Sequence, residues 1–381
     1  MRASALSVAI LSAFAASLAA GAAQAGDVEI YGIIDTGLNY QHVDADTQED
    51  ATNQLQMKSS QSIPNRWGMR GTESLANGLK VGFMLEGQFS SDTGEMTGGR
   101  LFHRTAQVSL TSQSLGTIAL GRSGALRSGF GSTGLWAVKI NPFSSSWGDY
   151  MIGNKYIMPG GFKAVDNAIT YQSPVMSGLQ LHAQYSMKID KNEDQVENKA
   201  SSDRQWGLGA TYTQGPVHVV AVLDSVMYAN SEETDDYDDS LAFSLGGTYN
   251  FGFMKLYVSG MYFKGMKQTE FQGHVFSGSN DIASGASYKG YSVQTGVDVP
   301  LWGGTAKANI AWMDAKVDQK VTFNEVNDED IDRFGIAVGY SYPLSKRTSL
   351  YAGAGYVRDT SNIDGREPSA IEAVSGMVVR F

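Results

Sequence analysis

Apolar and polar residues alternate along most of this sequence, and this period of two constrains the fold more than any other feature. In residues 241–251, large apolar side chains such as Phe243 and Leu245 take odd positions, and small or polar ones such as Ser244 take even positions. Segments 179–187 and 336–342 repeat the pattern. Because successive side chains of a β-strand point to opposite faces, the period predicts strands with one apolar and one polar face. An all-β fold is therefore expected.

The first 25 residues have a different character. A single basic residue, Arg2, precedes an apolar stretch, and the segment ends in Ala23-Gln24-Ala25. This order is typical of a secretory signal peptide cleaved after Ala25, with a buried N-terminal helix as the alternative. Residues 26–381 would then form one mature domain. No apolar run in them approaches the roughly 20 residues of a transmembrane helix, which leaves a soluble exported protein or an outer-membrane barrel.

The connections between the expected strands decide between these two destinations. Short turns, such as 76–78 and 302–304, alternate with long polar connections near 42–62, 91–99, 124–163, 190–203, 230–239, 266–287, 318–330 and 359–369. Short turns on one side and long loops on the other are typical of outer-membrane barrels, whose sheet must close because lipid offers no hydrogen bonds to open edges. The pattern predicts sixteen antiparallel strands, the last of which ends at Phe381.

Composition excludes several other classes of protein. A formal charge of −10 argues against a nucleic-acid partner, and the absence of cysteine excludes thiolate metal sites. The acidic run 232–239 lacks the spacing of a dedicated calcium loop, so it is interpreted as a solvated outer loop that shares divalent ions with lipopolysaccharide. No cofactor or metal is expected.

Several motifs resemble the general diffusion porins of the Gram-negative outer membrane. Those motifs are Arg66-Trp67-Gly68-Met69-Arg70-Gly71-Thr72-Glu73, Leu120-Gly121-Arg122, Asp166-Asn167-Ala168-Ile169-Thr170-Tyr171 and Leu344-Ser345-Lys346-Arg347-Thr348. The resemblance implies a homotrimer of sixteen-stranded barrels in the outer membrane, open to ions and small hydrophilic solutes. It also implies that Phe381 is the assembly signal for the β-barrel insertion machinery.

The resemblance further implies that the third long loop, residues 124–163, folds into the lumen and narrows it. This loop contains seven aromatic residues, too many for a freely solvated connection. A surface loop is the alternative interpretation. The loop contains one acid, Asp149, against several basic residues.

Charged residues that alternate with apolar ones are the candidates for the pore lining. A charge that faces lipid at mid-depth costs about 2–4 kcal/mol, so the face of Arg66 and Arg70 should be the watery one. The same parity directs Lys80 and Glu86 inward. The resemblance carries Arg66, Arg104 and, with a slip of one residue, Lys163 onto the constriction arginines of the family. The predicted lumen set is Arg66, Arg70, Lys80, Glu86, Arg104, Arg122, Asp149 and Lys163.

Two other functions stay open at this point. A substrate-specific channel would have a saturable lumen site, for which the aromatic residues of 124–163 are candidates. An outer-membrane barrel enzyme would need a Ser/His or Asp/His arrangement, and the five histidines match no such spacing.

The balance of charges predicts the ion preference. Of the 39 acids, 21 lie in four outer stretches, where salt screens them beyond about 8 Å. The constriction itself is mainly basic. A near-neutral to weak anion preference is therefore expected at physiological salt.

Overall fold

Strands account for most of the chain. The computed structural model describes residues 27–46, 51–130, 133–136, 139–144, 147–151, 163–190, 196–229, 238–267, 287–319, 330–361 and 367–381. The expected signal peptide lies outside these residues. Within them the strands are β1 Val28–Asp44, β2 Thr52–Ser59, β3 Arg66–Ser74, β4 Leu79–Gln88, β5 Thr105–Ser112, β6 Gly116–Gly124, β7 Ala164–Gln172, β8 Leu179–Ser186, β9 Arg204–Gln214, β10 Val217–Met227, β11 Leu241–Asn250, β12 Lys255–Lys267, β13 Ser287–Leu301, β14 Gly304–Gln319, β15 Asp330–Pro343, β16 Thr348–Ser361 and β17 Ser369–Arg380.

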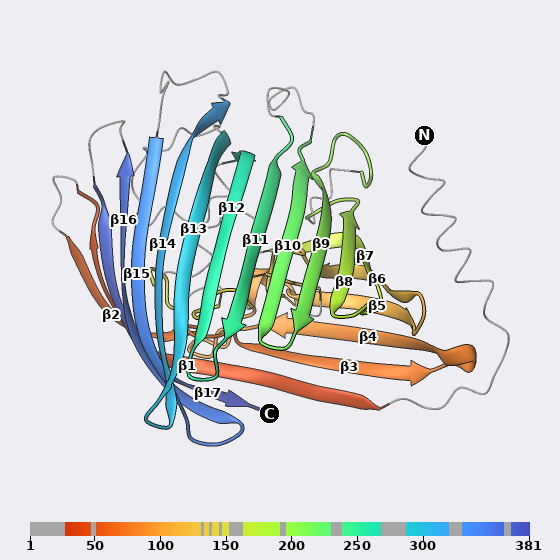
Figure 1. The fold of residues 1–381 in the computed structure, drawn as a ribbon, viewed down its shortest axis with the longest axis horizontal. Helices are drawn as coiled ribbons and strands as arrows, with labels where there is room; N and C mark the ends of the chain where they lie inside the picture. The colour runs from red at the N-terminus through yellow and green to blue at the C-terminus, as the bar shows by residue number, and fades with distance from the viewer. Residues whose placement is uncertain are drawn as a thin grey trace.

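Apart from β2 and β3, strands that follow one another in the sequence pair antiparallel, and the sheet closes because β17 pairs with β1. Both β2 and β3 pair with β1, along Thr36–Val43 and Val28–Ile33 respectively, so they are two halves of one barrel strand. The described strands therefore fill sixteen positions of a closed barrel, as the sequence predicted. Figure 1 shows β8–β16 side by side as one curved wall, with β1, β3 and β4 crossing behind it.

Alternation divides the wall into two faces. On β11 the side chains of Ala242 and Ser244 are fully buried, whereas Phe243 and Leu245 are about half exposed on the outside. The outward side chains are apolar, as a wall in contact with lipid requires. Among the described residues, no helix is long and apolar enough to cross a membrane.

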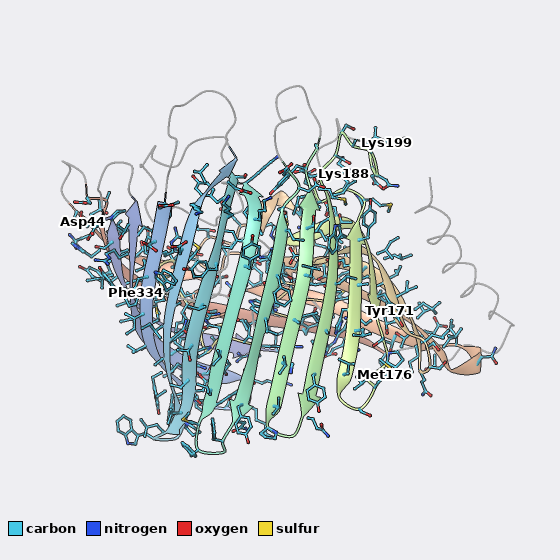
Figure 2. The ribbon with its side chains drawn as sticks, turned by 45° about the horizontal axis from the view of Figure 1, so that its top comes forward. Asp44, Tyr171, Met176, Lys188, Lys199 and Phe334 are labelled. Carbon is cyan, nitrogen blue, oxygen red and sulfur yellow. The ribbon has the colours of Figure 1, made fainter. Side chains whose placement is uncertain are left out.

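The two ends of the barrel differ in their connections. Short turns join the strands at one end, as at residues 76–78, where Asn77 adopts a positive φ of 61°. In Figure 2, Met176 lies toward this end, and Asp44, Lys188 and Lys199 lie toward the opposite end, where the long connections are. Exposed aromatic residues gather at the short turns, including Phe253, Trp302 and Tyr342.

One expected connection is largely a strand. The polar stretch near 42–62 was predicted to be a long loop, but β1 continues to Asp44 and β2 covers Thr52–Ser59. Leu55 and Met57 alternate with polar residues in β2 and are 70% and 62% exposed on the outer face. The strand has only two large apolar residues, so the alternation was too weak to predict it from the sequence.

The last residue completes the closure. Phe381 and Gly32 exchange backbone hydrogen bonds of 3.1 Å in both directions. A Cβ atom on Gly32 would lie 2.3 Å from the Phe381 ring, so the glycine leaves the room that this ring occupies. The seam between β1 and β17 therefore depends on a glycine facing the terminal aromatic side chain.

Candidate functional site

The inner faces of β3 and β4 bring the first candidate charges together. Between β3 and β4, Arg66 lies opposite Gln88 and Gly68 lies opposite Glu86. On the other side of β3, Ile33 of β1 lies opposite Arg66 and Tyr31 lies opposite Gly68. Because buried Asp35 and Asn39 continue the Ile33 face of β1, this is the inner face of the barrel. Strand parity thus places Arg66 and Glu86 on the face that the alternation predicted.

Arg104 joins them from outside the regular strand. It precedes β5, so the alternation of that strand does not fix the direction of its side chain. Its Nε donates to Glu86 at 2.5 Å and its guanidinium donates to Gln88 at 3.0 Å. The guanidinium carbon lies 4.3 Å from the centre of the Phe130 ring. Only 1% of the Arg104 side chain is exposed, which makes this a fixed positive charge.

Further arginines surround this pair. The charge of Arg66 interacts with those of Arg104, Glu86 and Arg380, and Arg380 is inward because it pairs with Ile33. Tyr31 donates its hydroxyl to Glu86 at 2.9 Å. We call Arg66, Arg104, Arg380 and Glu86 the basic cluster; it combines three cations with one carboxylate.

Two titratable side chains outside the strands add no charge to the site at neutral pH. Burial, followed by the positive charges of Arg122, Arg104 and Arg100, lowers the pKa of His103. Burial, followed by the negative charges of Asp149 and Glu372, raises the pKa of Tyr150. Both side chains are therefore neutral near pH 7.

Arg70 and Lys80 lie on the inner face at the short-turn end. Arg70 forms an exposed ion pair with Glu29 at 2.8 Å. Lys80 pairs with Ser74 beside the turn and is exposed. Their side chains are thus separated from the basic cluster along the strands.

Arg122 does not join the inner face. Ser123, the next residue, is buried and accepts an inward hydrogen bond from Gln184 at 3.1 Å, so Arg122 has the opposite parity. Arg122 donates to the His103 carbonyl at 2.7 Å and pairs with Asp166, which also pairs with Arg100 at 2.7 Å. The structure differs here from the predicted lumen set, because the motif marked where the strand ends and not which face the arginine takes.

The long connection after β6 is anchored on the inner wall by an arginine. Arg127 forms two hydrogen bonds of 2.8 Å to the carboxylate of Asp224 on β10, and both side chains are nearly fully buried. Trp136 is fully buried and its ring approaches Gly246 of β11. Further along, Asn141 donates to Gln294 of β13. The described part of the connection thus follows the inner face from β10 to β13.

A second anchor holds the other end of the described connection. Glu372 of β17 is fully buried. Its carboxylate accepts backbone N–H groups of Asp149, Tyr150 and Met151 at 2.9, 2.6 and 3.0 Å. Asn39 and Gln41 of β1 also donate to it. Five donors satisfy this buried carboxylate, which therefore fixes the path of the backbone.

The remaining candidates are Asp149, inside the connection, and Lys163, at its C-terminal end. Asp149 accepts a hydrogen bond from Gln41 at 2.7 Å and pairs with Lys58 of β2. The carbonyl of Lys163, just before β7, accepts the backbone N–H of Ala125 at 3.0 Å. The sole acid of the connection is thus already paired with a cation.

Sequence reasoning missed Glu372, Asp224 and Asp35. Each is an acid at an inward position of a strand whose outward positions are apolar, and this signal could have identified them. Asp35 accepts N–H groups of Ser62 and Ile63 at 2.6 and 2.8 Å and the Tyr351 hydroxyl at 2.6 Å. It thereby holds the break between β2 and β3, and Gln61 within that break accepts the N–H of Gly148 at 2.8 Å.

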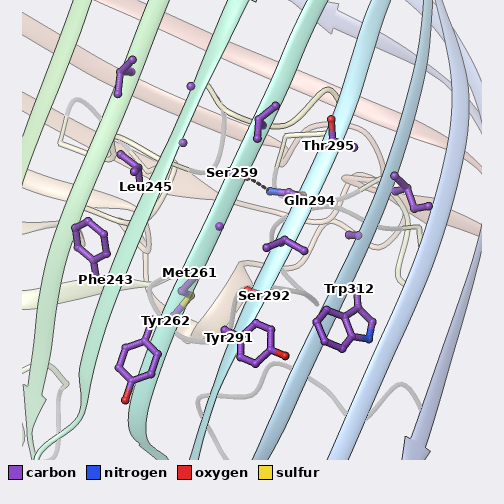
Figure 3. Close-up of a pocket in the computed structure, with 18 of the residues that line it drawn as sticks. Phe243, Leu245, Ser259, Met261, Tyr262, Tyr291, Ser292, Gln294, Thr295 and Trp312 are labelled. Atoms are coloured by element: carbon purple, nitrogen blue, oxygen red, sulfur yellow. Dashed lines mark hydrogen bonds between the residues drawn. The ribbon is translucent and has the colours of Figure 1, made fainter.

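The outer wall carries an apolar groove of about 940 Å³ across β10–β15. Figure 3 shows Tyr262, Tyr291 and Trp312 as a row along it, and the Tyr291 and Trp312 rings meet edge to face at 5.3 Å. Apart from Thr295, its outward lining is apolar or aromatic, as in a lipid-facing wall. Among the described residues, no group of three or more His, Asp or Glu side chains is arranged to hold a metal ion.

Comparisons with known proteins agree with this geometry. The family described as Gram-negative porin matches residues 7–362. An outer membrane porin protein of Bordetella pertussis is 32% identical over 97% of this chain and 98% of its own length. Outer membrane porin protein 32 of Delftia acidovorans is 31% identical over 92% of this chain and 89% of its own. An anion-selective porin from Comamonas acidovorans has the same fold, with a TM-score of 0.69 and 24% identity over 94% of this chain and all of that one.

Proposed function

The chain belongs to the Gram-negative porin family, and from this premise we propose that it is a passive outer-membrane channel whose narrowest part is basic. The family assignment confirms the predicted porin function and outer-membrane location, and it identifies a channel protein and not an enzyme. Ions and small hydrophilic solutes would cross through the water-filled lumen.

The observation that carries the proposal is the basic cluster beside a connection anchored on inward-facing residues. Arg104 is held by Glu86 and Gln88, and Arg66 lies close to it. Asp149, the acid of the connection, is paired with Lys58. The charges at the constriction would therefore favour anions, since fixed charges in a narrow pore are screened less than those on wet loops.

A saturable, substrate-specific channel is the second candidate, and the aromatic residues argue against it. Trp136 and Phe143 are fully buried, and Trp147 is 6% exposed. Phe143 and Trp147 form an edge-to-face pair with centroids 5.2 Å apart, and Trp147 also contacts Tyr351 at 5.3 Å. These three rings pack the connection onto the wall, so they offer little surface for a sugar to stack upon; Tyr156 and Phe162 lie outside the described residues.

The assembly follows from the same proposal. The mature domain would be residues 26–381, released by cleavage after Ala25, with Phe381 read by the β-barrel insertion machinery and the outer wall in contact with lipid and lipopolysaccharide. We propose a homotrimer; OmpT of Vibrio cholerae, which shares the fold at 14% identity and a TM-score of 0.57, has a trimer form. Arginines that face lipid are destabilising. We therefore propose that a neighbouring copy in the trimer covers the Arg100–Asp166–Arg122 group on the outer wall.

Planar-bilayer recording of the purified protein tests the function. The reversal potential across a KCl gradient is measured at two mean salt concentrations. At physiological salt, the channel is expected to show no ion preference or a weak preference for anions. At low salt the preference should move toward cations, because the charges of the outer acids are screened less. Strong cation selectivity at the higher salt would contradict a basic constriction.

A further inference from the structure

A second group of charges lines the inner wall near the short turns. Lys255 on β12 lies directly opposite Asp298 on β13, which in turn lies opposite Lys307 on β14. All three share the inward parity of the buried residues Tyr257 and Asn309. We call Lys255, Asp298 and Lys307 the lysine row.

The carboxylate of the row is occupied, but one of its ammonium groups is not matched. Lys307 lies 2.9 Å from one oxygen of Asp298, and the Tyr257 hydroxyl donates to the other at 2.8 Å. Lys255 instead places its Nζ 4.7 Å from the centre of the Tyr257 ring. Within the described part of the chain, no ion pair within 4.0 Å includes Lys255. Lys307 and Asp298 remain 15% and 18% exposed, so water reaches them.

The long connection passes directly beside this row. Pro142 packs on Gly296, which lies two residues before Asp298 on the same face of β13. Phe143 packs on Gly339 of β15, which lies directly opposite Lys307. Lys139 of the same segment is exposed. Lys139 lies two residues before Asn141, which donates to Gln294 of β13, and the charges of Lys139 and Lys255 both act on His218 of β10.

We infer that the lysine row, together with Lys139, forms a second anion-binding step on the short-turn side of the connection, for small doubly charged oxyanions such as phosphate or sulfate. This inference rests on the proposed channel. Three ammonium groups against one carboxylate leave two positive charges, and Lys255 and Lys307 stand two strand spacings apart, roughly 10 Å between backbones. Their flexible side chains can converge on one dianion, whereas chloride gains less because its charge is half as large.

The test measures block of the chloride current by sulfate in planar bilayers. Sulfate is expected to reduce the current of the unmodified channel in a saturable way. Lys255→Gln should raise the half-blocking concentration about thirtyfold, as expected when a divalent anion is no longer attracted by a unit positive charge about 4 Å away in water. Lys307→Gln should raise it at least as much, since Asp298 then loses its ion pair. The matched control is Lys346→Gln in an exposed short turn, where no change is expected.

A charge-rescue experiment separates electrostatics from misfolding. Because the chain has no cysteine, Lys255→Cys can be modified alone while the channel conducts. A trimethylammonium thiosulfonate should restore the sulfate block, and the neutral methyl reagent should not. Restoration by both reagents, or by neither, would overturn the inference.

Arg66→Gln distinguishes the lysine row from the basic cluster. If sulfate acts only at the cluster, Arg66→Gln will weaken the block and Lys255→Gln will leave it unchanged, which would refute a second step. Failure of the proposed function looks different, because the unmodified protein would then either form no channel or be strongly cation-selective.

Discussion

Glu86 shows how much one residue decides at this site. It accepts hydrogen bonds from Arg104 and Tyr31, and only 2% of it is exposed. One carboxylate therefore holds one arginine rigidly, while Arg66 and Arg380 supply charge that it does not neutralise. Alternation in the sequence identified Arg66 and Glu86. It could not orient Arg104, which lies before its strand, or Arg122, whose face depends on register.

The first prediction concerns the selectivity of the basic cluster. Arg66→Gln removes a cation without leaving an acid unpaired, because Arg66 donates to the Pro64 carbonyl. The chloride-to-potassium permeability ratio should fall about fivefold, which corresponds to about 1 kcal/mol for unit charges about 4 Å apart in water. Glu86→Gln should raise the ratio. Reversal potentials measure both.

The control for these variants is Lys264→Gln, which removes the same charge from the exposed outer face of β12. Its permeability ratio should equal that of the unmodified protein. Equal effects of Lys264→Gln and Arg66→Gln would show that net charge, and not the constriction, sets the preference.

The second prediction concerns the glycine at the seam. Gly32→Val keeps Phe381 in place but fills the room of its ring, so the barrel should lose about 1–3 kcal/mol through overpacking. The temperature at which the folded band disappears in heated gel samples measures this loss. Gly260→Val is the matched control, since a Cβ there approaches nothing closer than 3.3 Å. Equal melting of the two variants would disprove the packing role.

At the scale of elements, the connection after β6 is defined by its anchors. Its aromatic content predicted an ordered segment, but the partners could not be predicted because they lie far along the chain, on β10, β13 and β17. Such pairings depend on which strands face each other across the lumen, a property of closure and not of any local pattern. The strand β2 was missed for a local reason, since most of its residues are polar.

The third prediction tests the anchor at β17. Glu372→Gln replaces one acceptor oxygen by an amide that cannot accept N–H groups, and hydrogen bonds to a charged group contribute about 1.5–3 kcal/mol. The connection should loosen, seen as greater open-channel noise and faster proteolysis between residues 125 and 163. Glu367→Gln, an exposed acid near the same strand, is the control. Unchanged noise in Glu372→Gln would remove its anchoring role.

The fourth prediction concerns the width of the lumen. Replacing residues 128–160 with a short Gly-Ser link should raise the single-channel conductance and admit larger sugars, because we propose that this segment narrows the lumen. Liposome swelling with sugars of increasing size measures the cutoff. An unchanged conductance and cutoff would place the segment outside the pore.

At the scale of the whole molecule, the barrel was predictable because it is periodic. Alternation, short turns at one end and the strand that ends at Phe381 together specify sixteen positions and a closed sheet. Closure also means that no strand can be lost without opening an edge to lipid, where each unpaired backbone group costs several kcal/mol.

The fifth prediction is that deletion of Phe381 impairs assembly and not conduction. The outer-membrane level of the truncated protein should fall severalfold, measured by quantitative immunoblot of membrane fractions. The few channels that do insert should conduct normally. Normal levels of the truncated protein would rule out an assembly role for this residue.

The two anchors of the connection lie nearly opposite each other around the ring, Asp224 on β10 and Glu372 on β17. Between these anchors the connection follows the inner wall, where Phe143 packs on Gly339 of β15 and Met151 on Gly355 of β16, so it braces the wall from the inside. An unbraced sheet flattens easily under lateral pressure from the bilayer, so the cross-section of this barrel should stay rounder than that of the shortened variant. We therefore expect the same segment to set both the stiffness of the wall and the width of the channel.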